Sequence, residues 1–268
     1  YSRRLALSSI PYAIESRRLA AFEQACVKQF DSVLVITEAE GRVLDPHREY
    51  ENLHVVNNGV DLPTGLPRRA ESCGPVVGFV GAMDYAPNVD GVVWFTKHVW
   101  PRVRAADRRA RFLIIGRNPA RRVEKLARDE SITITGQVSD PRLMLDQCRV
   151  VVTPLRIARG LPNKALEAMA MGRPVVATTA VARCLNAQHN EHLLAADEPA
   201  EMADRVLELF ESDKRCAELA DAGTRFVSAF HNWTEILHRY EDLVMGRDQI
   251  RLAGLYAQSQ FSRRAIAV

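Results

Sequence analysis

The side chains best suited to chemistry gather in one segment, TPLRIARGLPNKALEAMAMGRPVVAT, which spans residues 153–178. Arg159 and Lys164 carry positive charge, and Gly160 gives the backbone freedom to turn before a predicted helix. The start of a helix presents unpaired N–H groups and the positive end of the helix dipole, which together favour phosphate. The segment therefore predicts a phosphate-binding site.

Glu167 adds a different chemistry to the same predicted helix. It follows Lys164 by three residues and Asn163 by four, so the three side chains share one helix face. A carboxylate is unsuited to phosphate, but it accepts two hydrogen bonds from a sugar diol such as ribose. The spacing also suits a simple surface ion pair between Lys164 and Glu167, and it leaves both interpretations open.

Two further loops offer backbone groups to a ligand. In FVGAMDYAPNVDG (79–91), Gly81 ends a predicted strand and permits close approach, and Asn88 or Asp90 is expected to cap the next helix. In TGQVSDP (135–141), exposed backbone groups suit the flat edge of a nucleobase, and Ser139 or Asp140 is expected to cap a helix. Taken alone, each loop is equally consistent with residues that only form a turn and cap a helix.

The elements that position these loops alternate between apolar strands and amphipathic helices, which predicts an α/β fold with a doubly wound parallel sheet. In such sheets ligands bind beyond the carboxyl ends of the strands, where all three loops fall. The predicted strands are 75–83, 110–116, 131–136, 149–155 and 173–179, and the predicted helices are 89–106, 121–129, 141–147, 162–172, 199–212, 214–230 and 233–245.

Before Pro75 the pattern predicts a helix at 12–30, strands at 31–38 and 52–56, and a short helix between them. About fifty residues cannot close a core alone. Because the chain starts at Tyr1 within such a pattern, we expect residues 1–52 to be the closing part of a preceding α/β domain. Residues 53–74 are then a linker, 75–245 a complete domain and 246–268 a tail.

Composition narrows the function classes. The 268 residues are 47% hydrophobic and 26% charged, with a net charge of +3, which is typical of a globular protein and too weak to indicate a nucleic-acid partner. Five scattered cysteines without a C-x-x-C pair, and the lack of a secretory h-region, favour the cytoplasm. Seven dispersed histidines form no clustered metal motif, and we expect no cofactor.

Several motifs in sequence order resemble the family-four (group 1) glycosyltransferases of GT-B fold, from about residue 12 to 245. The combination of GxMxYxPN with RGLPNKALEAMA is most similar to bacterial sugar transferases of exopolysaccharide and PEP-CTERM gene clusters. The motifs are NNGVD (57–61), GAMDYAPN (81–88), IIG (114–116), TGQVSD (135–140), the segment 159–178 and NWTEILHRYEDLV (232–244).

The resemblance implies two Rossmann-like domains with the active site between them. Residues 75–245 would hold a nucleotide-diphosphate sugar. A glycan or lipid-linked acceptor would bind mostly in the absent N-terminal domain, and that domain would also make any peripheral contact with a membrane. Such enzymes are usually retaining and metal-independent. The chain would then be mainly the donor-binding half, or alternatively a non-catalytic module that binds a nucleotide-sugar or a partner.

The resemblance also implies donor-binding roles for individual residues, and it leaves the catalytic residues unassigned. Glu167 would bind the ribose hydroxyls, backbone around Gly160, Leu161 and Asn163 would face the diphosphate, and Gly81 and Asn88 would lie along the donor cleft. Backbone near Gln137 and Val138 would contact the base.

Two departures from the family pattern concern charge. The family commonly has a glutamate eight residues before Glu167, where this chain has Arg159. The family's phosphate-binding Arg and Lys after the first strand are also missing, since Ala82-Met83 and Pro87-Asn88 stand there. Arg159 and Lys164 would supply this charge from the other loop.

This relocation of charge predicts that Arg159→Ala weakens nucleoside-diphosphate binding at least tenfold, or about 1.4 kcal/mol. Calorimetric titration measures the change, and an unaltered affinity would contradict the role of Arg159.

Overall fold

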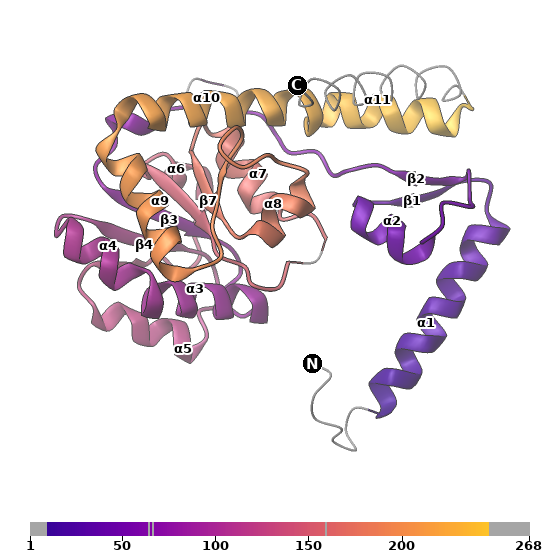
Figure 1. Ribbon diagram of the computed structural model, residues 1–268, viewed down its shortest axis with the longest axis horizontal. Helices are drawn as coiled ribbons and strands as arrows, with labels where there is room; N and C mark the ends of the chain where they lie inside the picture. The colour runs from indigo at the N-terminus through magenta and orange to yellow at the C-terminus, as the bar shows by residue number, and fades with distance from the viewer. Residues whose placement is uncertain (1–9, 64, 66, 159, 247–268) are drawn as a thin grey trace, which may run out of the picture. The chain divides into compact units, whose positions relative to one another are not determined.

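The computed structural model describes residues 10–63, 65, 67–158 and 160–246 (Figure 1). The described chain forms two compact units, one comprising residues 58–235 and the other residues 10–57 and 236–246. Each unit is described by itself below.

The larger unit is built on a six-stranded sheet in the order β5-β4-β3-β6-β7-β8, and every pairing is parallel. From β3 the chain proceeds through β4 to β5, and from β6 it proceeds the other way to β7 and β8. The sequence prediction of a doubly wound parallel sheet is confirmed. The strands are β3 (Val76–Val80), β4 (Arg111–Ile115), β5 (Ile132–Ile134), β6 (Val150–Thr153), β7 (Val175–Ala177) and β8 (Leu194–Ala195).

Helices cover both faces of this sheet, with α3, α4 and α5 grouped on one side and α7 and α8 on the other (Figure 1). Central strands are consequently buried throughout, as β6 and β7 are at every position. The helices are α3 (Ala86–His98), α4 (Trp100–Ala106), α5 (Arg121–Glu124), α6 (Pro141–Leu145), α7 (Asn163–Ala170), α8 (Thr179–Leu185), α9 (Pro199–Glu211) and α10 (Asp213–Phe230), with 3-10 turns at Ala70–Ser72 and Lys125–Arg128.

Some local predictions were wrong. The single helix expected at 89–106 is divided at Val99, because Pro101 has no N–H to donate and begins a new helix well only within its first turn. Neither Asn88 nor Asp90 caps α3, which begins earlier and has Tyr85 at its N-cap. The expected cap at Asp140 is confirmed, since its side chain accepts the N–H of Arg142.

Two buried arginines lie at the amino ends of β6 and β7. Arg149 donates from Nε to the carbonyl of Leu209 at 2.7 Å, from Nη1 to the carbonyl of Glu71 at 2.7 Å, and from Nη2 to Asp213 at 2.5 Å. Arg173, fully buried, donates to the carbonyls of Met171 and Cys148 at 3.0 and 2.9 Å. The guanidinium of Arg149 thus joins the segment before β3 to the helices after β8.

The smaller unit contains a short parallel β–α–β arrangement. Its elements are α1 (Ile10–Gln29), β1 (Val33–Val35), α2 (Glu38–Leu44) and β2 (Leu53–Val55), and β1 pairs with β2. A capping box starts α2, because Thr37 accepts the N–H of Glu40 and Glu40 accepts the N–H of Thr37. Helix α11 (Trp233–Val244) includes residues of both units.

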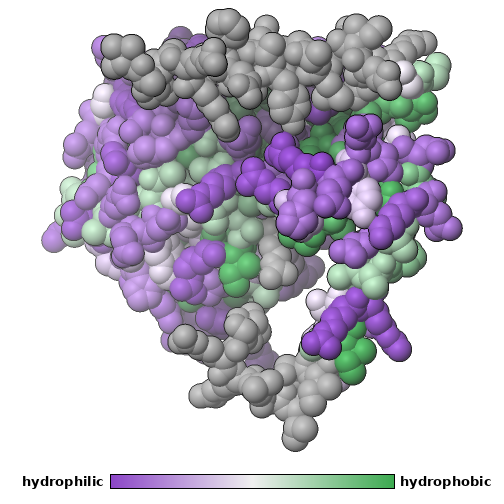
Figure 2. Space-filling view, turned by 45° about the vertical axis from the view of Figure 1, so that its right-hand side comes forward, coloured by the Kyte–Doolittle hydropathy of each residue, from purple (hydrophilic) through white to green (hydrophobic). Residues whose placement is uncertain are grey.

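The visible surface is largely hydrophilic, with apolar patches interspersed (Figure 2). Among the described helices, none is at once long enough and apolar enough to span a bilayer.

Gly116, directly after β4, generates a prediction about stability. A Cβ atom at this position would overlap the carbonyl oxygen of Gly81, which follows the neighbouring strand β3. We expect Gly116→Ala to lower the free energy of unfolding by about 2–3 kcal/mol, because backbone must move to admit the methyl group. Urea denaturation measures this loss.

Gly74→Ala is the matched control for that substitution, since Gly74 is exposed and its added Cβ would meet no atom within 4 Å. Equal stability of the two variants would contradict the packing argument.

Candidate nucleotide-binding site

Two of the predicted loops, those after β3 and β6, flank the point where the sheet changes direction, and the third follows the edge strand β5. In doubly wound sheets this point opens a crevice, because the connections on its two sides leave in opposite directions. Two contacts join its sides. A Cβ on Gly91 of α3 would lie 2.8 Å from the carbonyl oxygen of Pro154, and Asp90 accepts a 2.7 Å ion pair from Arg156.

Lys164 reaches from the first turn of α7 across this crevice to the start of α3. Its Nζ donates to Oδ1 of Asn88 and lies 5.2 Å from the ring centroid of Phe79 on β3. The Nδ2 of Asn88 donates to the carbonyl of Ala82 at 2.9 Å. A Cβ on Gly81 would lie 2.6 Å from that Nδ2 and 3.3 Å from Nζ, so a glycine at 81 leaves room for both groups.

The surroundings of Lys164 disfavour its charged form. Burial lowers the pKa of its amine to about 8, and the nearby Glu167 carboxylate opposes this change only in part. The amine of Lys164 is therefore still positively charged near neutral pH, but its charge is only weakly hydrated. An anion entering the crevice would supply the missing counter-charge.

Glu167 lies one helical turn further along α7 and is exposed at the surface. Its carboxylate forms no hydrogen bond or ion pair with any described residue, so the surface ion pair with Lys164 is not formed. The surrounding protein raises its pKa through partial desolvation. Lys164 and Arg142 oppose the rise, and Asp61 adds to it. Glu167 is thus a carboxylate available to donors from a ligand.

The loop before α7 places several predicted residues at the same edge. Gly160 has a φ of 68°, a left-handed conformation that favours glycine. The N–H groups of Asn163 and Ala165 donate to the carbonyls of Leu161 and Pro162, both at 2.9 Å. The side-chain oxygen of Asn163 is buried and accepts no hydrogen bond from any residue that the structure describes.

The remaining predicted residues lie on the neighbouring loop or outside the description. Gln137 is exposed and Val138 packs partly on the core in the loop between β5 and α6. The electrostatic effect of Arg142 on Glu167 places the start of α6 near α7. Arg159 lies outside the described residues.

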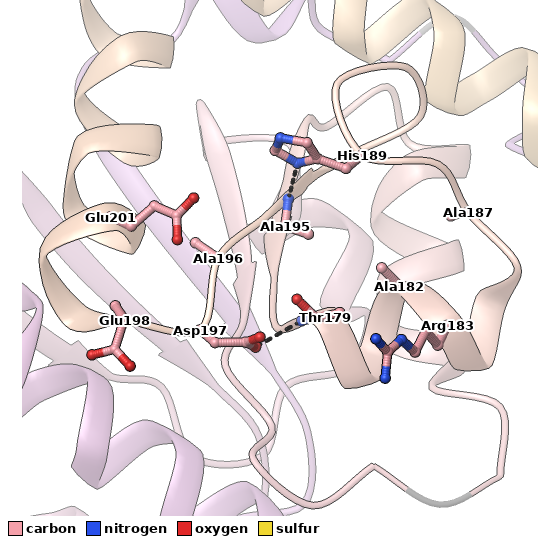
Figure 3. A pocket seen from close by; sticks show the side chains of 10 residues that line it. All are labelled: Thr179, Ala182, Arg183, Ala187, His189, Ala195, Ala196, Asp197, Glu198 and Glu201. Carbon is pink, nitrogen blue, oxygen red and sulfur yellow. Dashed lines mark hydrogen bonds between the residues drawn. The ribbon is translucent and has the colours of Figure 1, made fainter. Parts of the chain in front are cut away.

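A separate cavity of about 540 Å³ lies beyond β7 and β8 (Figure 3). Asp197, Glu198 and Glu201 line it, and Arg183 is the one arginine or lysine among its lining residues. Asp197 accepts the N–H of Thr179 at 2.9 Å, which satisfies the start of α8. Three carboxylates would repel a diphosphate, so this cavity is a poorer nucleotide site than the crevice.

The part of the chain that the structure describes contains no group of three or more His, Cys, Asp or Glu side chains arranged to hold a metal ion.

Comparison with protein families identifies the larger unit. The profile of the family "Glycosyl transferases group 1" matches residues 74–212, more than half of the chain. The chain belongs to the group 1 glycosyl transferases. No curated protein sequence gives a significant match.

Solved structures share the fold of this group 1 chain at low sequence identity. A variant of S. aureus TarM, crystallised with fondaparinux, alpha-GlcNAc-glycerol and UDP, is 20% identical with a TM-score of 0.66, over 81% of this chain and 44% of that one. Anabaena HepE in complex with UDP-glucose is 16% identical with a TM-score of 0.67, over 85% and 68% of the two chains.

The pneumococcal O-GlcNAc transferase GtfA, in complex with UDP and GlcNAc, is 12% identical with a TM-score of 0.66, over 85% and 47% of the two chains. This chain therefore spans under half the length of TarM and of GtfA.

Sequence reasoning missed three contributors to the crevice. The sequence predicts Phe79 only as part of a buried strand, and Asp61 only as the last residue of the NNGVD motif, with no role at the site. For Arg142 the sequence offers only a weak indication of a role at the site, namely that it follows the predicted cap Asp140 by two residues. Their closeness to α7 depends on the fold, which no local pattern encodes.

Because the charge on Lys164 is poorly hydrated, we predict that it favours anion binding but lowers the stability of the folded protein. We expect Lys164→Met to raise the free energy of unfolding at pH 7 by about 1 kcal/mol, because the apolar part remains and the charge is removed. The gain should shrink above pH 8, since folded Lys164 then loses its proton while unfolded lysine keeps it up to about pH 10. Thermal and urea denaturation at several pH values measure both effects.

Lys97→Met, on the exposed side of α3, is the control and should change stability little. A clear loss of stability in Lys164→Met at pH 7 would contradict this account of Lys164.

Proposed function

We propose that this protein transfers a sugar from a nucleotide-diphosphate sugar to a glycan or lipid-linked acceptor. The solved neighbours that contain UDP support a UDP-sugar as the donor. The observation that carries the proposal is that α7 presents two complementary side chains at the switch point. Lys164 donates to Asn88 there, and Glu167 has no hydrogen-bond or ion-pair partner among the described residues. Membership of the group 1 family and the UDP complexes of TarM, HepE and GtfA support the same donor class.

In this proposal each part of the crevice binds one part of the donor. Lys164 pairs with the diphosphate beside Gly81, and the backbone of Gly160–Asn163 lies along it. Glu167 accepts hydrogen bonds from the ribose hydroxyls. The backbone of Gln137 and Val138 contacts the base, and Arg159 adds charge at the phosphates.

The chemistry that follows is stabilisation of a departing nucleoside diphosphate. Negative charge grows on the leaving diphosphate as the sugar bond breaks, and a positioned Lys164 stabilises that charge where water is excluded. We assign no catalytic nucleophile or base. A retaining, metal-independent reaction is what the family resemblance implies, and it remains part of the proposal.

The wider setting is also a proposal. Residues 75–245 would be the donor domain, residues 53–74 a linker, and residues 1–52 the closing part of an acceptor domain, with contact to a membrane surface through that domain. The reaction would occur in the cytoplasm during cell-surface polysaccharide synthesis of the exopolysaccharide or PEP-CTERM type.

Calorimetric titration of the chain with UDP, GDP and ADP tests the donor site. We expect UDP to bind, and Glu167→Gln to weaken its binding at least tenfold, or about 1.4 kcal/mol, because the ribose loses its carboxylate acceptor. In a double-mutant cycle, 2′-deoxy-UDP should bind the native chain weakly and lose little more in Glu167→Gln.

Glu201→Gln is the matched control, because Glu201 lines the separate cavity of Figure 3 and should leave UDP affinity unchanged. Unchanged affinity in Glu167→Gln, or a loss in Glu201→Gln instead, would contradict the assignment. Release of UDP from a UDP-sugar by the chain would exclude the alternative of a binding module without turnover.

A further inference from the structure

The amine of Lys164 has an unusual set of partners for a phosphate-binding lysine. Its one hydrogen-bond acceptor among the described residues is the neutral amide oxygen of Asn88, a residue that is 3% exposed. Phe79, whose ring lies 5.2 Å away, is fully buried. The amine therefore lies in a largely apolar recess and has exchanged water for one amide and one aromatic ring.

The groups around the amine of Lys164 do not compensate for the hydration that the amine loses on burial. The strand β3 contributes Phe79 and Gly81, and α3 contributes Asn88, all of them neutral. Among the described residues of α7, Glu167 is the charged group that acts on the amine, and it forms no ion pair with it. Burial dominates over Glu167, and the pKa of the amine is about 8.

A nucleoside diphosphate in the crevice would reverse this balance. Its phosphate oxygens would bring negative charge to an amine that lacks a counter-ion, and an opposite charge within a few ångströms favours the protonated lysine. Asn88 keeps the amine at this position, because its Nδ2 is fixed on the carbonyl of Ala82 and its Oδ1 holds Nζ.

We infer that nucleoside-diphosphate binding in this crevice is coupled to uptake of a proton by Lys164, with Asn88 acting as the positioning residue that holds the amine in its recess. The inference rests on the proposed function. The step is an acid–base one: the neutral amine takes a proton from solvent and becomes an ammonium ion paired with phosphate, and no covalent bond to phosphorus changes.

The direction of the pH effect follows from this coupling. Below pH 7 the free protein already carries the proton, so binding takes up almost none. Above pH 8 the free protein has lost the proton that the complex retains, so affinity falls as pH rises. With a pKa of about 8 in the free protein, uptake at pH 8.5 is roughly 0.7 proton per site.

Calorimetry of UDP binding in two buffers that differ in ionisation enthalpy measures this uptake. At pH 8.5 the phosphates of UDP are fully ionised, since the second ionisation of phosphate groups lies near pH 6. We expect roughly 0.7 proton taken up by the native chain, and a dissociation constant that rises roughly eightfold from pH 7.5 to 9.

Three variants assign the proton to its residue. Lys164→Arg keeps its charge throughout this range and should bind UDP without proton uptake and with an affinity independent of pH. Asn88→Asp gives Lys164 a carboxylate partner, so the amine is already charged and uptake should fall toward zero. Lys97→Arg, on the exposed side of α3, should behave as the native chain does.

The outcomes separate the inference from the function on which it rests. UDP binding without proton uptake, or uptake that persists in both Lys164→Arg and Asn88→Asp, overturns the coupling and leaves the proposed function intact. Failure of UDP, GDP and ADP to bind at any pH overturns the proposed function and the coupling with it.

Discussion

The crevice depends on two glycines that bring the ends of β3 and β4 together. Gly116 packs so closely on the backbone of Gly81 that no side chain fits between them, and the space beside Gly81 is filled by Asn88 and Lys164. Because Gly81 has no side chain, Asn88 and Lys164 can both approach the end of β3, and the parallel pairing of β3 with β6 brings α3 and α7 to the same edge of the sheet.

The two ends of the sheet are built on opposite principles. At the amino end, buried Arg149 and Arg173 each donate to two backbone carbonyls and form ion pairs with Asp213 and Asp146. At the carboxyl end, Lys164 has one neutral acceptor, and Glu167 has no hydrogen-bond donor among the described residues. Charges left incompletely satisfied are costly to a fold, and they are typical of places where a ligand completes the set.

The sequence predicts most of the sheet because its strands are short apolar runs separated by regular helical patterns. The sequence does not predict α8 and β8, because both are too short to show a hydrophobic period. It also misses the division of the predicted helix 89–106 at Val99, which depends on the position of Pro101. For the site, spacing correctly groups Asn163, Lys164 and Glu167 on one short helix. The contact of Lys164 with Asn88 spans 76 residues of sequence, and only the sheet topology brings these residues together.

The hydrogen bonds of Arg149 determine which fragments of the larger unit can fold stably. The family match covers residues 74–212, yet the carbonyl of Glu71 and the carboxylate of Asp213, both bonded to this guanidinium, fall just outside it. A fragment cut at the family limits would leave the buried guanidinium of Arg149 without two of its acceptors, and an unsatisfied buried donor lowers the stability of a fold. A stable form of this unit therefore has to extend beyond residues 74–212 on both sides, to include Glu71 and Asp213.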